Sequence, residues 1–214
     1  RVNMLFNQYG AKIKTLPVDE EGLRVDLIPS YFKFKELKLV YLNSRAHYPT
    51  SVPLSKERRK LLLEYAETYD FVIIEDDIYA EYESQNSFKS SLFYENHGKR
   101  VLYLGLLGGF LTPGFQTHYL LGAVDFIEEA HKYLSLFGEP NVLLAQAIGE
   151  MIKEGDMHRY RRKAKQAQST KKQYFIKKLQ ESFGRDISYQ SAESDIAIWI
   201  CFNKNFSLLE WREL

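Results

Sequence analysis

The stretch that decides the fold is "LKLVYLNSRAHYPTSVPLSKERRKLLLEYAETYDFVIIE", which runs from Leu37 to Glu75. It begins with "LKLVYL" and ends with "FVIIE", two apolar runs that have the length of a strand. Between them, a helix is predicted from Ser55 to Tyr69, because a capping serine precedes apolar residues that recur on one side. Strands that are apolar throughout are covered on both faces, so this order of strand, helix and strand predicts an α/β layer with a largely parallel sheet.

The rest of the chain divides near Gly138. Before it, "RVLYLG" (100–105) and "THYLLGAV" (117–124) extend the sheet, and a short strand is expected at 11–16 ahead of the turn "PVDEEG". After it the pattern becomes helical, and "ISYQ" and "DIAIWICF" then alternate as strands of a smaller α/β unit. The predicted division is a large domain over 1–138, linking helices over 139–183 and the start of a small domain over 184–214.

Composition narrows the class of protein. The 214 residues are 45% hydrophobic and 27% charged, values typical of a soluble globular domain, and the net charge of +1 gives no argument for an acidic or nucleic-acid partner. No apolar run approaches the roughly 20 residues of a membrane helix. The single Cys201 excludes an internal disulfide, which indicates an intracellular, cytoplasmic protein, and its apolar surroundings predict a buried, inert thiol. Both ends look cut, so we expect part of a larger protein.

Polar residues follow three of the predicted strands. Asp76 and Tyr79 come after "FVIIE", His47 and Tyr48 come after "LKLVYL", and the third strand leads into "YLGLLGGFLTPGFQ" (103–116). Ligands of open α/β sheets collect beyond the carboxyl ends of the strands, so these three segments are expected to line one crevice. A carboxylate there can hold a protonated ring nitrogen, and a phenol can hydrogen-bond a neighbouring oxygen.

At this point a family resemblance becomes specific. "VYLNSRAHYPTSVPLSKERRKLLLEYAETYDFVIIEDDIYAEY" (40–82), "YLGLLGGFLTPGF" and "AQAIGEMIKEGD" resemble fold-type I pyridoxal-phosphate aminotransferases. The sequence is most similar to the aminotransferase-like domain of MocR-type transcriptional regulators in the GntR superfamily. The resemblance implies a three-layer α/β fold, with the mainly parallel sheet of the large domain and part of a smaller α/β domain. It also implies a homodimer whose site is built across two chains, and DNA binding through a separate N-terminal winged helix-turn-helix domain.

The resemblance assigns roles to three residues that fit the family pattern. Asp76 matches the aspartate that pairs with the pyridine nitrogen of pyridoxal phosphate, and Tyr79 matches the tyrosine near the phenolic oxygen of the ring. Tyr48 stands where aminotransferases carry an asparagine and MocR-type domains often carry tyrosine. The aspartate matters because it keeps the ring nitrogen protonated, and a pyridinium is the electron sink of the cofactor's chemistry.

The loop that follows the third strand departs from the family pattern. Tyr103, Gly105, Pro113 and Gly114 keep its register without a gap. In that register, Leu106 stands where the family has its first hydroxyl residue, and Gly108 stands where it has a serine. Gly109 replaces the Schiff-base lysine, and Gln116 replaces the phosphate-binding arginine.

These departures remove the covalent chemistry that the resemblance would otherwise imply. Glycine has no amine with which to form an aldimine, and the phosphate loses two hydroxyl donors and a bidentate guanidinium. No lysine lies between Lys99 and Lys132, so a substitute would have to come from a distant part of the chain. A different interpretation is an ordinary strand-to-turn connection, in which the glycines only supply unusual backbone angles.

Two further features have a structural and a functional interpretation. The helix that contains "HRYRRKAKQAQSTKK" is strongly basic, which is typical of a solvated face and less often of a DNA-binding surface. The family's usual histidine on this helix falls at Tyr160. "EDD" (75–77) is a poor metal site, because adjacent residues that leave a strand point to opposite sides.

The resemblance and its departures favour an effector-sensing domain of a regulator over a catalyst. Its ligand is expected to be a small molecule such as an amine or an amino acid. One alternative is a fragment or altered copy of a working pyridoxal-phosphate aminotransferase. Another is a piece that mainly supports dimerisation.

Overall fold

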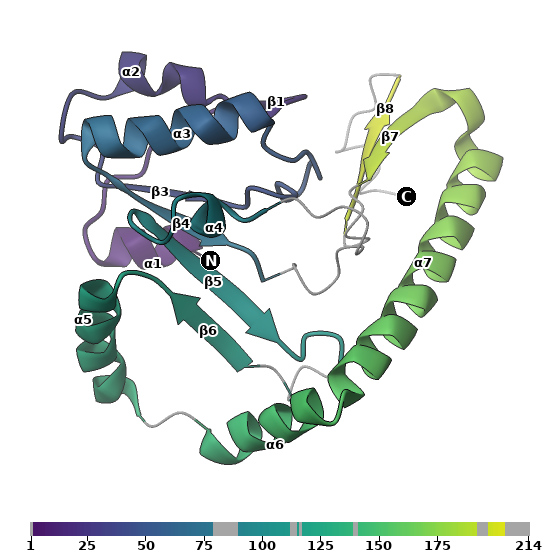
Figure 1. Ribbon diagram of the computed structural model, residues 1–214. Helices are drawn as coiled ribbons and strands as arrows, with labels where there is room; N and C mark the ends of the chain where they lie inside the picture. The colour runs from purple at the N-terminus through teal and green to yellow at the C-terminus, as the bar shows by residue number, and fades with distance from the viewer. Residues whose placement is uncertain are drawn as a thin grey trace.

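The computed structural model describes residues 2–78, 90–111, 115, 117–138, 141–191 and 197–203. Its central sheet has four strands in the order β3, β4, β5 and β6 (Figure 1). The first three strands are parallel and β6 is antiparallel to β5, so the mainly parallel α/β layer expected from the sequence is confirmed. The strands are β3 (Leu39–Leu42), β4 (Val72–Asp76), β5 (Val101–Leu107) and β6 (Thr117–Leu121).

The crossover between β3 and β4 is helix α3 (Lys56–Tyr69), as the sequence predicts. Ser55 caps its first turn by accepting a hydrogen bond from the backbone nitrogen of Arg58, which satisfies one of the free donors at a helix start. The helix ends at Asp70, whose φ of 59° turns the chain toward β4. Its fully buried side chains, Leu62 and Ala66, attach it to one face of the sheet.

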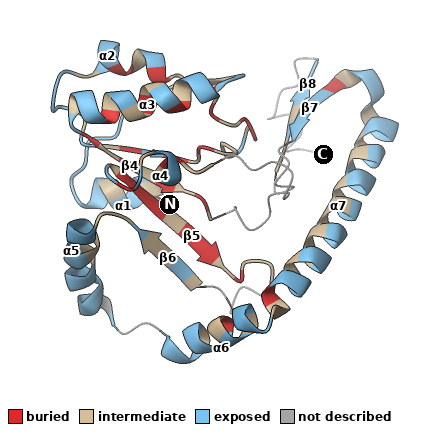
Figure 2. Cartoon of the chain, viewed as in Figure 1, coloured by how far each residue is buried: buried red, intermediate tan, exposed pale blue. Residues whose placement is uncertain are grey.

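The core lies between this face of the sheet and the helices that cover it. Figure 2 shows the buried residues concentrated on β4 and β5. The cluster also takes in side chains that precede β3, since Val25 and Ile28 are fully buried. Its members are Val25, Ile28, Val40, Leu42, Leu54, Leu62, Ala66, Phe71, Ile73, Leu92 and Val101.

Helices make up most of the remaining described chain. The long helix α7 runs away from the sheet and brings the chain to a hairpin of β7 and β8, which lies beside the first part of the molecule (Figure 1). The helices are α1 (Val2–Gln8), α2 (Ile28–Tyr31), α4 (Leu92–Glu95), α5 (Val124–Leu134), α6 (Val142–Lys153) and α7 (Asp156–Phe183). Short 3₁₀ helices lie at Val25–Leu27, Ser135–Phe137 and Gly184–Asp186. The domain boundaries at 138 and 183 stay predictions.

The prediction of a strand at 11–16 is wrong. Those residues are mostly exposed and form neither a helix nor a strand, because no strand in the described part of the chain pairs with them. The pairing starts later, inside the segment read as a turn, where β1 (Val18–Asp19) pairs with β2 (Gly22–Leu23). The Asp19 side chain accepts from the backbone nitrogen of Glu21 at 2.9 Å, and Gly22 has a φ of +89°, so local turn chemistry sets this hairpin.

The prediction for Cys201 is also wrong, since its thiol is exposed. Cys201 lies on β8 (Ile198–Phe202), which pairs in antiparallel fashion with β7 (Ile187–Ser191). Within the described residues this sheet has only two strands, so the apolar composition of β8 does not bring burial with it. Among the described helices, none is long and apolar enough to cross a membrane.

Candidate functional site

The candidate site lies at the edge of the sheet where the three parallel strands end. Asp76 is the last residue of β4 and is paired in register with Leu104 of β5. The end of β3 lies beside it, because Leu42 pairs with Glu75, whereas β5 continues three residues past Leu104. The convergence of the three following segments on one crevice stays a prediction. Tyr79 and Gln116, two of the residues predicted for the site, lie outside the described residues, as do Pro113 and Gly114.

The Asp76 carboxylate is partly exposed and is held from the neighbouring strand. The hydroxyl of Tyr41, on β3, donates to its Oδ2 atom. Its Oδ1 atom accepts a longer hydrogen bond, 3.3 Å, from the backbone nitrogen of Ile78. Asp76 is therefore an oriented carboxylate at the rim, which is what a ligand that bears a cationic nitrogen requires.

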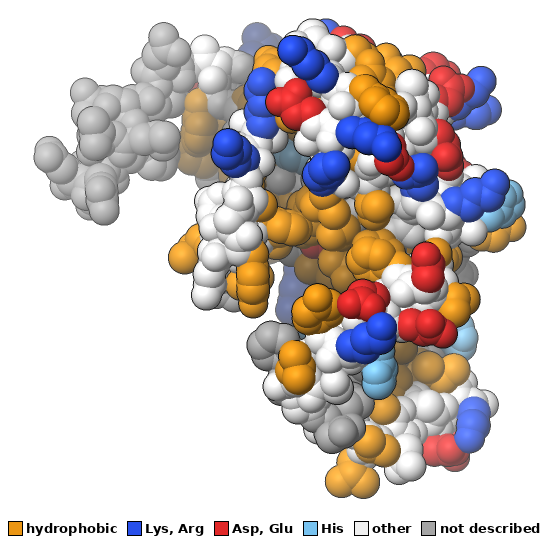
Figure 3. All heavy atoms as spheres, turned by 90° about the vertical axis from the view of Figure 1, so that its left-hand side faces the viewer, with side chains coloured by type: hydrophobic (Ala, Val, Ile, Leu, Met, Phe, Trp, Pro, Cys, Tyr) orange, Lys and Arg blue, Asp and Glu red, His pale blue; other side chains and the backbone are white. Residues whose placement is uncertain are grey.

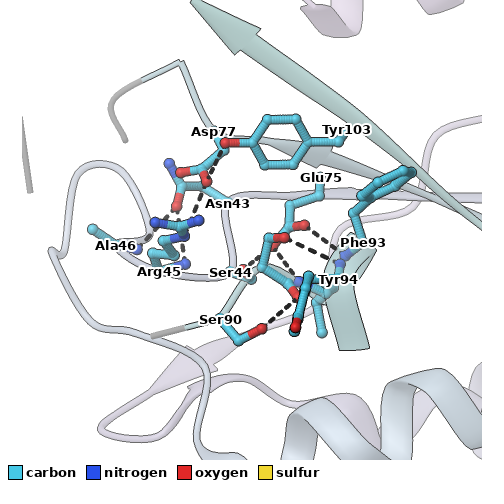
Figure 4. A network of polar contacts seen from close by, with 12 residues as sticks. Asn43, Ser44, Arg45, Ala46, Glu75, Asp77, Ser90, Phe93, Tyr94 and Tyr103 are labelled. Carbon is cyan, nitrogen blue, oxygen red and sulfur yellow. Dashed lines mark hydrogen bonds and ion pairs between the residues drawn. The ribbon is translucent and has the colours of Figure 1, made fainter. Parts of the chain in front are cut away.

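Glu75, one residue earlier, points into the core and has no exposed surface. It accepts hydrogen bonds from the backbone nitrogens of Leu92 at 2.9 Å and Phe93 at 3.0 Å, and from the Ser44 hydroxyl (Figure 4). Ser44 in turn accepts from an Arg59 nitrogen at 3.2 Å. These contacts attach the end of β4 to the first turn of α4 and to α3, and a buried carboxylate needs such partners to be tolerated.

Asp77 is also almost fully buried, and it lies in a second polar cluster. The Tyr103 hydroxyl donates to its Oδ2 atom at 2.9 Å, and the Arg45 guanidinium forms an ion pair with the same oxygen at 2.9 Å (Figure 4). Burial and the nearby Asp77 carboxylate raise the pKa of Tyr103, so this phenol remains a hydrogen-bond donor. The cluster thus connects the segments that follow β3 and β4 to Tyr103 within β5.

The run Glu75–Asp77 thus separates into buried and rim carboxylates. Glu75 and Asp77 are satisfied inside the fold by protein donors, whereas Asp76 is directed to the other side of the strand. Alternation along a strand produces this division. No group of three residues that could hold a metal ion is found in the described part of the chain.

Tyr48 lies on the loop between β3 and α3, with 65% of its surface exposed. The loop is held by its own contacts: His47 Nδ1 and Thr50 Oγ1 lie 2.9 Å apart, and the backbone nitrogen of His47 donates to the Val52 carbonyl at 2.9 Å. Burial lowers the pKa of His47. The hydroxyl of Ser51 donates to the Ala197 carbonyl at 3.1 Å, so this loop contacts the residue that precedes β8.

The glycines of the loop after β5 have a tight structural basis. Gly105 lies against the ring of Tyr119, and a Cβ atom there would come within 2.1 Å of it. Gly108 has a φ of +79°, and a Cβ atom there would lie 2.3 Å from the carbonyl oxygen of Phe115. Gly109 follows in the same turn. The backbone therefore has no room for the serine that the family pattern places at 108.

A cavity of about 440 Å³ lies elsewhere, between the β1–β2 turn and the β7–β8 hairpin. Its polar lining includes Asp19, Glu20, Glu21, Arg58 and Gln190, and Trp199 adds an aromatic wall. It does not include Asp76 or Tyr48. We place the candidate site at the strand edge, because the oriented carboxylate of Asp76 lies there beside the end of β3.

Several residues around this edge were missed by sequence reasoning. Tyr41 belongs to a run that the sequence predicts only as an apolar strand. The hydroxyl of its side chain was the one sign in the sequence that it could have a polar role. Ser44 and Arg45 follow the same strand, and nothing in their spacing shows that they join carboxylates more than 30 positions away. Such long-range pairs become visible only in the fold.

Comparison with known proteins agrees with this architecture. No family model matches the chain. It is 26% identical to aromatic-amino-acid aminotransferase 1 of Thermococcus litoralis, over 91% of the chain and 48% of that protein. It is also 26% identical to the uncharacterized HTH-type transcriptional regulator YisV of Bacillus subtilis, over 94% of the chain and 42% of the regulator. The chain thus spans about half the length of the curated relatives it matches.

The fold has close counterparts among solved structures. Kynurenine aminotransferase of Pyrococcus horikoshii superimposes with a TM-score of 0.84, at 23% identity, over 98% of the chain and 54% of that enzyme. The chain therefore has the fold of the fold-type I aminotransferases, as a partial domain. The resemblance to their MocR-type, aminotransferase-like counterparts in transcriptional regulators is confirmed by the regulator relatives.

Proposed function

We propose that the chain is the effector-sensing, aminotransferase-like part of a transcriptional regulator, and that it does not form a covalent adduct with pyridoxal phosphate. The proposal rests on Gly109, which stands where the family pattern has the Schiff-base lysine. The turn at Gly108 supports it, because the carbonyl oxygen of Phe115 leaves no space for a side chain there. A loop that carries serine at this position must have a different shape. The regulators among the relatives support the same choice.

Pyridoxal phosphate fits the rim only in part. Asp76 is a suitable partner for a protonated ring nitrogen. In contrast, Leu106 and Gly108 offer no hydroxyl to a phosphate, and Gly109 offers no amine to an aldehyde. The described residues thus suit a small organic cation, with a protonated amine or a protonated ring nitrogen, better than the phosphorylated cofactor. Tyr48, Tyr79 and Gln116 complete the proposed set of binding residues.

The proposed regulator acts as a cytoplasmic homodimer and contacts DNA through a separate helix-turn-helix domain. Apolar side chains on α5 and α6 support self-association, since Leu134 and Leu143 are 60% and 80% exposed. Figure 3 shows hydrophobic side chains gathered on the side where α1 and α5 lie, around a hollow in that face. Contiguous apolar surface of this kind is typical of interaction sites.

Absorbance spectroscopy tests the absence of covalent chemistry. Pyridoxal phosphate is added to the full-length protein and the visible band of an aldimine is followed. We expect this band to be no stronger than the band that pyridoxal phosphate gives with a control protein, which has only surface lysines. A stable band that persists after gel filtration would contradict the proposal. The sequence ahead of Arg1 supplies a second test, because the proposal requires a winged helix-turn-helix domain there.

The second candidate function is an altered copy of a pyridoxal-phosphate aminotransferase. The oriented carboxylate of Asp76 favours it, and so do the aminotransferases among the relatives. This candidate predicts transfer of an amino group to a 2-oxo acid by the full-length protein. Turnover that is lost in an Asp76→Asn variant would select the enzyme, and absence of turnover would select the sensor.

A further inference from the structure

The contact between Tyr41 and Asp76 joins neighbouring strands on the face of the sheet opposite the core. Tyr41 is paired in register with Ile74, so Asp76 lies two residues further along β4. A diagonal neighbour at this distance is within reach of a long aromatic side chain. The Tyr41 hydroxyl spans it and donates to Asp76 Oδ2.

Core packing does not explain Tyr41. Its neighbours Val40 and Leu42 are 8% and 6% exposed, whereas Tyr41 is 36% exposed. The strand therefore buries the residues on either side and leaves the tyrosine ring at the surface, beside the rim. Its hydroxyl donates to Asp76, the one carboxylate of the 75–77 run that is not almost fully buried.

The bond restricts the Asp76 carboxylate. Without it, the described donors to Asp76 reduce to the longer contact from the Ile78 backbone. A carboxylate that rotates freely must lose that freedom when a ligand binds, whereas a side chain already held in one orientation does not. Groups that orient a ligand-binding residue from behind commonly matter to affinity, although they never touch the ligand.

We infer that Tyr41 is a positioning residue for the proposed effector site: its hydroxyl holds Asp76 in the orientation that receives a cationic nitrogen. This inference rests on the proposed function. It adds a residue from β3 to the site and names the ligand atom on which the residue acts, a ring or amine nitrogen that carries a proton. Removal of the hydroxyl should therefore weaken recognition of that nitrogen and leave the rest of the ligand unaffected.

Two matched probes test the inference. Pyridoxamine carries the ring nitrogen but has no aldehyde and no phosphate, so it cannot form an aldimine with a lysine. Its carbocyclic isostere has a CH group in place of the ring nitrogen. Binding of each probe to the full-length protein is measured by calorimetry for the wild type, Tyr41→Phe and Asp76→Asn, with Tyr174→Phe on α7 as the control. Thermal unfolding of each variant checks that it folds.

We expect Tyr41→Phe to weaken pyridoxamine binding roughly threefold to tenfold, the range for one net hydrogen bond, and to leave the isostere unchanged. Asp76→Asn should abolish the preference for pyridoxamine, and Tyr174→Phe should change neither probe. If Tyr41→Phe weakens both probes equally, or neither, the positioning role is overturned while the effect of Asp76→Asn keeps the proposed function. If the wild type does not prefer pyridoxamine over the isostere, Asp76 does not receive the ring nitrogen and the positioning role of Tyr41 is overturned. The absence of a covalent adduct is tested separately by the absorbance measurement.

Discussion

Gly108 is the residue at which the loop after β5 is most tightly constrained. Its φ of +79° is one that L side chains rarely adopt, and the carbonyl oxygen of Phe115 occupies the place of a Cβ atom. Backbone oxygen cannot move aside as a flexible side chain can. The sequence comparison counts Gly108 as a lost serine, but the structure makes it a residue on which the present loop depends.

A Gly108→Ala substitution should therefore destabilise the protein by about 1–3 kcal/mol, from backbone strain and the contact with Phe115. The matched control is Gly149→Ala in the middle of α6, where a Cβ atom meets nothing within 4 Å. The control should stabilise by about 0.5–1 kcal/mol, since alanine favours a helix over glycine. Urea unfolding of both variants measures the difference. A Gly108→Ala protein as stable as the wild type would show that the loop has another conformation.

Glu75 gives a second prediction at this scale. Its oxygens accept from two backbone nitrogens and a hydroxyl in a fully buried position. In Glu75→Gln, an amide NH₂ would face a donor, so a buried backbone nitrogen would lose its partner at a cost of about 1–3 kcal/mol. Glu128→Gln on the exposed side of α5 is the control and should change stability little. Equal stabilities of the two variants in urea unfolding would contradict the role given to Glu75.

Among the elements, those with a strong local pattern could be predicted from the sequence. Helix α3 begins after its capping Ser55, as expected, and the basic segment "HRYRRKAKQAQSTKK" lies on helix α7, also as expected. The apolar runs became β3, β4 and β5. Helix α5 was missed, because the segment 117–124 was read as one strand, whereas β6 ends at Leu121 and the helix begins three residues later. The β1–β2 hairpin was missed because its pairing spans two residues in each strand.

The site could be predicted only where one residue acts alone. The place of Asp76 at the sheet edge could be predicted because it follows an apolar strand, and its role in the site stays a prediction. The hydrogen bond from Tyr41 to Asp76 joins residues 35 positions apart, and the one from Ser44 to Glu75 joins residues 31 positions apart. The Arg45–Asp77 ion pair also joins separate segments of the chain. Such pairs depend on the register between strands, which periodicity in one strand does not contain.

The β1–β2 hairpin is attached to the start of α3 by a pair whose strength depends on pH. Arg58 donates to both oxygens of Asp19 and also to the Gly22 carbonyl. The hydrogen bond from Arg58 lowers the pKa of Asp19 from 3.8 to about 2. A carboxyl whose folded pKa is lowered stabilises the fold above its unfolded pKa, and this contribution is lost as the pH falls toward the folded value.

Asp19→Asn should therefore be less stable than the wild type at neutral pH, and the difference between the two should shrink as the pH falls from about 4 to about 2. Urea unfolding at a series of pH values measures this difference. Lys60→Gln, at the exposed side of α3, removes a charge from the same helix without touching Asp19 and serves as the control. A difference that stays constant down to pH 2 would show that the ion pair does not stabilise the hairpin.

At the scale of the whole molecule, apolar side chains of α5 and α6 are exposed among the described residues, and the proposed self-association would cover them. Within the described residues α5 has no buried side chain, although its hydrophobic residues are concentrated on one side. On α6 the described buried residue is Ile148, while Val142 and Leu143 are 56% and 80% exposed. A helix with such a face is stabilised by packing it against another surface.

Leu143→Asp should consequently weaken self-association of the full-length protein, by tenfold or more if Leu143 lies within the interface, since a charge would be buried without a partner. Sedimentation velocity over a range of concentrations measures the effect. Gln173→Asp, on the exposed side of α7, is the matched control. A wild-type protein that remains monomeric at all concentrations, or a Leu143→Asp variant that associates as tightly as the wild type, would contradict this assignment of the surface.

The whole molecule is proposed to sense a small molecule at the strand edge without covalent cofactor chemistry. The most direct measurement is borohydride reduction of the full-length protein after incubation with pyridoxal phosphate, followed by peptide mapping in a mass spectrometer. The same procedure on Asp76→Asn separates a specific site from surface lysines. We expect only scattered, substoichiometric labelling that is the same in both proteins. One stoichiometric pyridoxyl-lysine that disappears in Asp76→Asn would contradict it.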